Sequence, residues 1–150
     1  MEYTAIEPAV RAFLEEAERI SVLSPAEQAA LCTRRTQGDR AAGEALLRAQ
    51  YPMLGNLIQH LPRDLRTPEL TERLLARLRE ITEGFDFCTD EGFGRVFSRE
   101  MRAVTPLLHA RDLYLRDGRL TDTLSPENGE LLRQFLWAQY YREQEIVPGP

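Results

Sequence analysis

The clearest pattern of hydrophobic and polar positions lies in residues 67–86, TPELTERLLARLREITEGFD. Thr67 and Pro68 are suited to the start of a helix, and Gly84 is expected to end it in a left-handed conformation. Between them apolar residues recur at helical spacing and predict a core-facing stripe: Leu70, Leu74, Leu75, Leu78 and Ile81. The remaining surface is charged: Glu69, Glu72, Arg73, Arg77, Arg79, Glu80 and Glu83. The pattern therefore predicts an amphipathic helix with one face open to solvent or to a partner.

The same periodicity predicts further helices along the chain. Ser24, Pro25 and Glu27 have the order of a capping box, and Gly38 followed by Asp39 marks the end of one helix and the cap of the next. The predicted helices span residues 8–20, 25–37, 40–61, 93–104, 107–116 and 127–142. The stretch 40–61 is either one helix bent at Pro52 and Gly55 or two helices.

No stretch of useful length alternates in the manner of a β-strand. The sequence therefore predicts an all-α fold, a compact bundle of six to seven helices. Phe85, Phe87 and Phe93 are expected to close one end of its core. Residues 1–119 are predicted to form the helical domain, and 120–150 a final helix and tail packed on it.

Composition places the chain among globular proteins, with 150 residues, 43% hydrophobic and 29% charged. No apolar run reaches the length of a membrane span, and the first residues lack a secretory pattern, so a cytoplasmic location is expected. Cys32 and Cys88 are far apart in the sequence. They are interpreted as small apolar fillers in a reducing compartment, not as a disulfide or a metal site.

The net charge is −5, and every basic residue is an arginine. The chain is acidic at both ends and neutral in the middle, which argues against a general nucleic-acid coat and favours a protein partner. A local contact between phosphate and arginine stays open, because guanidinium groups bind phosphate through two parallel hydrogen bonds.

Residues with recognisable catalytic spacing are missing from the sequence. His60 and His109 each lack a second histidine at helical spacing, and neither the glycines nor the cysteines form a phosphate-binding or nucleophile motif. The chain is therefore predicted not to be an enzyme and to have no cofactor, metal ion or small-molecule substrate.

Several segments, taken in order, resemble the N-terminal half of a bacterial sigma factor, the subunit that gives RNA polymerase its promoter specificity. They are a helix at 10–20, the cap LSPAE at 23–27, a basic pair before Gly38-Asp39, a helix at 45–54, and the helices that begin near 67 and 93. The resemblance covers about residues 8 to 105. It implies a sigma-domain-2-like fold and a role in transcription initiation. The resemblance does not extend to the C-terminal helix-turn-helix module of that family, which the chain is expected to lack.

The resemblance also implies two binding surfaces. In the family, the helix at 67–83 docks on the clamp helices of the largest polymerase subunit. The corresponding residues here are Glu69, Leu70, Glu72, Arg73, Arg77 and Glu80. Arg73 departs from the pattern, since a glutamate is usual at that position. The helix that begins at 93 corresponds to the promoter-melting helix and would contact promoter DNA through Arg95, Arg99 and Arg102, but it has Val96 where compact members have tryptophan.

Two functional hypotheses follow. The first is a sigma-like protein that binds RNA polymerase and directs or modulates initiation, with a regulator favoured because the melting helix lacks tryptophan. The second is a helical adaptor domain with only ancestral sigma resemblance, motivated by the acidic ends and by the final predicted helix at 127–142. It is favoured if that helix covers the charged face at 69–77 and its aromatic residues form an open patch: Phe135, Trp137, Tyr140 and Tyr141.

Overall fold

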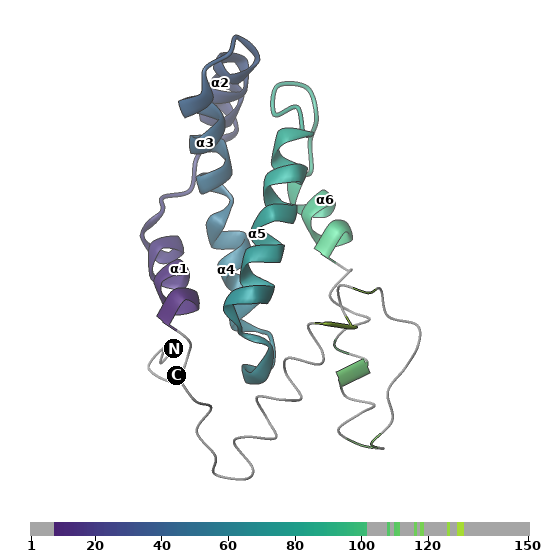
Figure 1. The fold of residues 1–150 in the computed structure, drawn as a ribbon. Coiled ribbons are helices and arrows are strands. Elements are labelled where there is room, and N and C mark those ends of the chain that lie inside the picture. The colour runs from purple at the N-terminus through teal and green to yellow at the C-terminus, as the bar shows by residue number, and fades with distance from the viewer. Residues whose placement is uncertain are drawn as a thin grey trace. The chain divides into compact units, whose positions relative to one another are not determined.

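The computed structural model describes residues 8–101 and, after them, the isolated positions 108, 110, 111, 116, 118, 126, 129 and 130. The chain divides into two compact units, Met1–Arg99 and Glu100–Pro150. The domain boundary predicted at 119/120 lies inside the second unit and stays a prediction. The helices are α1 (Pro8–Arg19), α2 (Pro25–Thr36), α3 (Arg40–Ala49), α4 (Tyr51–Gln59), the 3-10 turn η1 (Arg63–Leu65), α5 (Pro68–Glu83) and α6 (Phe93–Glu100) (Figure 1).

The all-α class is confirmed, since the described residues contain helices and no strand. The predicted total of six to seven helices is not confirmed, because the stretches 107–116 and 127–142 lie largely outside the described residues. The helix predicted at 93–104 ends earlier, at Glu100.

Local capping explains where the first helices begin and end. The hydroxyl of Ser24 accepts a hydrogen bond from the Glu27 N–H, and the Glu27 carboxylate accepts one from the Ser24 N–H, which completes the predicted capping box. Asp39 caps α3 by accepting from the Ala42 N–H. Gly38 ends α2 at φ +93°, a left-handed conformation that glycine adopts without steric cost.

The stretch 40–61 forms two helices, with the break at Gln50 and not at Pro52 or Gly55. Pro52 occupies the first turn of α4, where its missing N–H costs no hydrogen bond. Gly55 lies inside α4, where a Cβ atom would stand 3.2 Å from the Ala17 Cβ. The glycine therefore permits close approach of α4 to α1 and does not bend the helix.

The core of the first unit lies where α5 packs against α1, α3 and α4, while α2 packs beside α3 and α1 beside α4 (Figure 1). Its fully buried side chains are mostly leucines, and the largest are Leu14, Leu46, Leu54, Ile58, Leu65 and Leu78. Burying an aliphatic side chain of this size stabilises the folded state by about 1.5–3 kcal/mol. These leucines hold α5 by one side, and this leaves its other side exposed.

The predicted aromatic cluster closes the core beyond the end of α5. The Phe85 ring centroid lies 4.8 Å from that of Phe87 and 5.2 Å from that of Phe93, in edge-to-face arrangements. Phe85 and Phe93 are buried. The cluster ties the start of α6 to the loop that follows α5.

Candidate functional site

The start of α5 follows the sequence prediction, but its end does not. The Thr67 hydroxyl accepts a hydrogen bond from the Leu70 N–H, and Pro68 occupies the first turn. Gly84 has φ −86°, a right-handed conformation, so the predicted left-handed ending is wrong. The end of α5 is stabilised from outside, because the Arg35 side chain of α2 donates to the carbonyl oxygens of Thr82 and Phe85, each at 2.8 Å.

The buried face of α5 differs in detail from the predicted stripe. Four of the predicted residues are buried, whereas Leu75 is only half-buried. Thr71 and Thr82 are buried in addition, and the Thr82 hydroxyl donates to the Leu78 carbonyl oxygen at 2.8 Å. A threonine can join a core face when its hydroxyl is bonded to the helix backbone in this way.

The residues matched to polymerase binding separate into surface and core. Glu69, Glu72, Arg77 and Glu80 are exposed, and Arg73 is half-buried. Leu70 is only 2% exposed and belongs to the core, so it is removed from the proposed contact surface. We call the exposed set Glu69, Glu72, Arg77 and Glu80 the acidic-basic face of α5.

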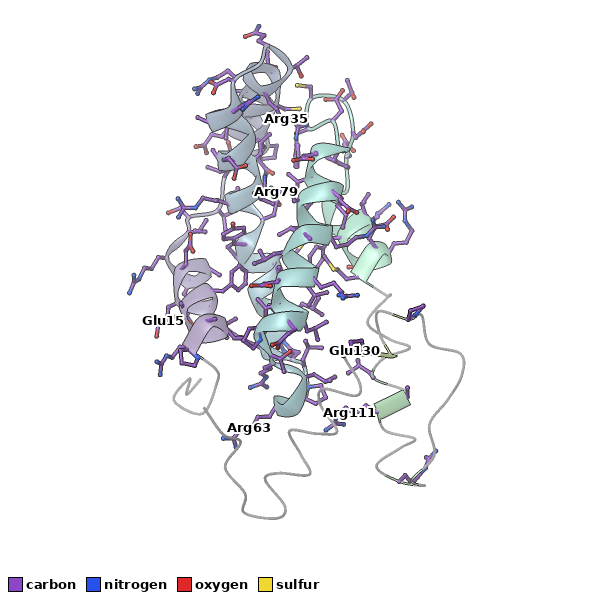
Figure 2. All side chains as sticks on the ribbon, viewed as in Figure 1. Glu15, Arg35, Arg63, Arg79, Arg111 and Glu130 are labelled. Carbon is purple, nitrogen blue, oxygen red and sulfur yellow. The ribbon has the colours of Figure 1, made fainter. Side chains whose placement is uncertain are left out.

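Ion pairs organise the C-terminal half of this helix. Arg77 Nη1 lies 2.7 Å from Glu80 Oε2 within α5, whereas the Arg79 guanidinium binds both carboxylate oxygens of Glu44 on α3, at 2.6 and 3.3 Å. Hydrogen bonding to Arg79 lowers the pKa of Glu44, and the same bond raises the pKa of Arg79. Arg79 therefore lies between α5 and α3 (Figure 2) and serves to join the two helices.

The basic pair at the end of α2 has structural partners. Arg34 forms an ion pair with Asp39 at 2.7 Å, next to the cap of α3. Arg35 donates to the two carbonyl oxygens at the end of α5 and also, from Nη2, to the Cys32 sulfur at 3.3 Å. Both arginines thus connect helix ends, a role that the sequence pattern did not reveal.

The two cysteines lie close together in space, although they are far apart in the sequence, and the interpretation as a buried apolar filler agrees with the structure for Cys32 but is wrong for Cys88. Cys32 on α2 is buried, but Cys88 is exposed in the loop after α5. Asp86 lies beside them, and the two Sγ atoms and a carboxylate oxygen all lie within 4.8 Å of one another. The sequence carries no sign of this cluster, because 54 residues separate Cys32 from Asp86.

The residues matched to DNA contact lie on α6 or beyond it. Arg95 and Arg99 are exposed, and Val96 is half-buried. Arg102 lies outside the described residues, as do the aromatic residues of the predicted final helix. α6 therefore presents two arginines and no exposed aromatic side chain among its described positions.

Comparison with protein-family models, with curated proteins and with solved structures gives no significant match. Within the part of the chain that the structure describes, every helix is too short or too polar to cross a lipid bilayer. Any assignment of function therefore depends on the geometry of the chain itself and on the segment order seen in its sequence.

Proposed function

We propose that this chain is a sigma-like transcription protein that binds RNA polymerase through the clamp helices of the largest subunit. It acts by binding and not by catalysis, and it modulates or directs initiation. The observation that carries the proposal is the pair Glu69 and Glu72, both exposed on a helix whose opposite side is held in the core. The order of segments between residues 10 and 104 supports it independently.

The chemistry of the acidic-basic face suits a basic partner helix. Glu69 and Glu72 are three residues apart and so lie on the same side of α5, in its first two turns. Two carboxylates at that spacing attract a row of arginine or lysine side chains and increase the association rate. Arg77 and Glu80, one turn further on, are already paired with each other and contribute less net charge.

Arg73 modifies the expected partner. A positive charge where the family has glutamate would repel a basic group on the clamp, and like charges at a contact cost several kcal/mol in unfavourable cases. The side chain is half-buried and takes part in an interaction within the protein. The proposal therefore places the main contact at Glu69 and Glu72, away from Arg73.

The side chains of α6 differ from those of the promoter-melting helix that it resembles, and this difference bears on its role. Arg95 and Arg99 are exposed and suited to bind phosphate groups of promoter DNA. The half-buried Val96 cannot stack on a flipped base as tryptophan would. This difference favours a regulator that occupies polymerase over a factor that melts promoters alone.

Binding to core RNA polymerase, and to its isolated clamp coiled coil, tests the proposal directly. Reversing either charge, with Glu69→Arg or with Glu72→Arg, is expected to weaken binding by about tenfold or more, which corresponds to about 1.4 kcal/mol. Glu15→Arg on α1 is the matched control, because Glu15 is equally an exposed helical glutamate (Figure 2). Circular dichroism confirms that each variant is folded.

Two results would contradict the proposal. One is failure of the unmutated protein to bind either polymerase target, which would leave the adaptor hypothesis as the better explanation. The other is equal loss of binding in the Glu15→Arg control, which would show that net charge and not the α5 surface controls the interaction.

A further inference from the structure

We propose that Cys32, Asp86 and Cys88 form a binding site for a zinc-type divalent cation, which joins α2 to the loop after α5. The proposal does not depend on polymerase binding. The two sulfur atoms and one carboxylate oxygen lie within 4.8 Å of one another, and Cys32 Sγ lies 3.7 Å from Asp86 Oδ1. Thiolate and carboxylate ligands in this combination favour zinc over magnesium or calcium, which prefer oxygen ligands alone.

The spacing is close to that of a bound ion. With Zn–S bonds of about 2.3 Å and Zn–O bonds of about 2.1 Å in tetrahedral geometry, neighbouring ligand atoms are separated by about 3.6–3.8 Å. The Cys32–Asp86 distance of 3.7 Å already matches that value. The other pairs of ligand atoms are at most 4.8 Å apart, so each pair would have to move closer by at most about 1 Å to bind the ion. Rotation of the exposed Cys88 side chain can provide such a movement.

Asp86 is held in position to act as a ligand. Its Oδ1 accepts a hydrogen bond from the Cys88 N–H at 2.9 Å, and its Oδ2 accepts one from the Thr89 hydroxyl at 2.9 Å. These bonds fix the orientation of the carboxylate beside the two sulfur atoms. Oδ1 also accepts a hydrogen bond from the Cys32 thiol at 3.7 Å, and loss of that thiol proton on metal binding would free this lone pair for the ion.

The surrounding charge fits a site with two thiolates and one carboxylate. Those three ligands around a divalent cation leave a net charge of about −1. Arg35 Nη2 lies 3.3 Å from Cys32 Sγ, and its guanidinium is fixed by the carbonyl oxygens of Thr82 in α5 and of Phe85 just after it. A hydrogen bond that an N–H group donates to a ligating sulfur stabilises the metal-bound thiolate. The positive charge of the Arg35 guanidinium also compensates the net negative charge of the site.

The fourth coordination position would face solvent, since Asp86 and Cys88 are both exposed. Water or an external ligand can occupy it, as in zinc sites with three protein ligands. Because the ligands come from α2 and from a loop 54 residues later, the ion would fasten that loop to α2. The loop leads directly into Phe93 and α6, so metal binding would restrict the orientation of the start of that helix.

Titration of the reduced, metal-free full chain with Co²⁺ tests the proposal. We expect one equivalent to bind, with sulfur-to-cobalt charge-transfer absorption and the intense visible bands of tetrahedral cobalt. Zn²⁺ should displace the cobalt and raise the unfolding temperature. Cys88→Ser should remove the charge-transfer bands, and Asp86→Asn should weaken affinity by about tenfold or more. Glu91→Gln, an exposed acid in the same loop, is the matched control and should bind as the unmutated chain does.

Cys88 is exposed, so its substitution leaves the core intact and the folded state can be verified by circular dichroism. The proposal is overturned if no thiolate–cobalt absorption develops, or if Cys88→Ser leaves it unchanged. It is also overturned if the reduced chain binds no metal while peroxide converts the two thiols to a Cys32–Cys88 disulfide, with reduction of the peroxide to water. No polymerase is present in these titrations, so their result is independent of the polymerase proposal.

Discussion

Replacing Arg35 by alanine tests how the end of α5 is stabilised. In the folded protein this guanidinium donates to the Thr82 and Phe85 carbonyl oxygens, each at 2.8 Å. The last carbonyl groups of a helix have no partner within the helix and carry the negative end of its dipole. Arg35 supplies both hydrogen-bond donors and positive charge at that point, from a helix 47 residues earlier in the sequence.

The magnitude follows from those two bonds. Hydrogen bonds to a charged group contribute about 1.5–3 kcal/mol each when buried, and here the side chain is half-buried, so water replaces part of the loss. We expect Arg35→Ala to lower the free energy of unfolding by about 2–3 kcal/mol. The neighbouring Arg34→Ala is the control. Its exposed ion pair with Asp39 contributes about 0–1 kcal/mol.

Urea unfolding, followed by circular dichroism, measures both variants under the same conditions. The reasoning is refuted if Arg35→Ala costs no more than Arg34→Ala. Gly43 provides an internal check, because a Cβ there would stand 3.3 Å from the Arg35 Cδ. The change in unfolding free energy caused by Gly43→Ala should therefore be more stabilising when Arg35 is replaced by alanine than in the unmutated chain, by about 1 kcal/mol or less.

The remaining predictions concern packing and pH. Gly55→Leu should destabilise the protein by about 1–3 kcal/mol in urea unfolding, because the new Cβ would stand 3.2 Å from the Ala17 Cβ. Gly94→Ala is the control: a Cβ at Gly94 meets open space, so this substitution should be neutral or stabilising by about 1 kcal/mol. The hydrogen bond from the Ala42 N–H, followed by that from Arg34, lowers the pKa of Asp39 below its ordinary value of 3.8. Its ionised form therefore stabilises the folded state above pH 3.8, and this contribution is lost as the pH falls through the folded pKa. Asp39→Asn keeps the cap but removes the titration, so unfolding free energies measured from pH 6 to pH 2 should fall less steeply; an unchanged slope would contradict the assignment.

The predictions that succeeded are those that depend on neighbours in the sequence. Ser24 and Glu27 are three residues apart, and so are Thr67 and the Leu70 N–H that it caps, so a short pattern contains the whole interaction. The same is true of the charged face of α5, where periodicity alone placed Glu69 and Glu72 at the surface. Local chemistry determined these features.

The predictions that failed depend on distant parts of the chain. Glycine commonly ends or bends a helix, and this is the basis of the predictions for Gly84 and Gly55. At Gly84, however, the Arg35 side chain of α2 stabilises the end of α5. At Gly55, the glycine allows α4 to approach α1 closely. The Arg79–Glu44 ion pair joins residues 35 positions apart, and Cys32 meets Asp86 across 54. No periodicity encodes such contacts, so the candidate metal site became visible only in three dimensions.

The proposed polymerase surface begins in the first turns of α5, whereas the proposed metal site lies beyond the other end of that helix, on α2 and in the loop after α5, and this makes their tests independent. Glu72 lies about 16 Å along the helix axis from Glu83, at 1.5 Å per residue, and this exceeds the screening length of about 10 Å in 0.1 M salt. Charge reversal at Glu69 or at Glu72 should therefore leave cobalt affinity unchanged, and Cys88→Ser should leave polymerase binding unchanged. If folded Cys88→Ser protein lost both activities, the loop after α5 would belong to the polymerase contact, and the acidic-basic face could no longer be treated as a separate surface.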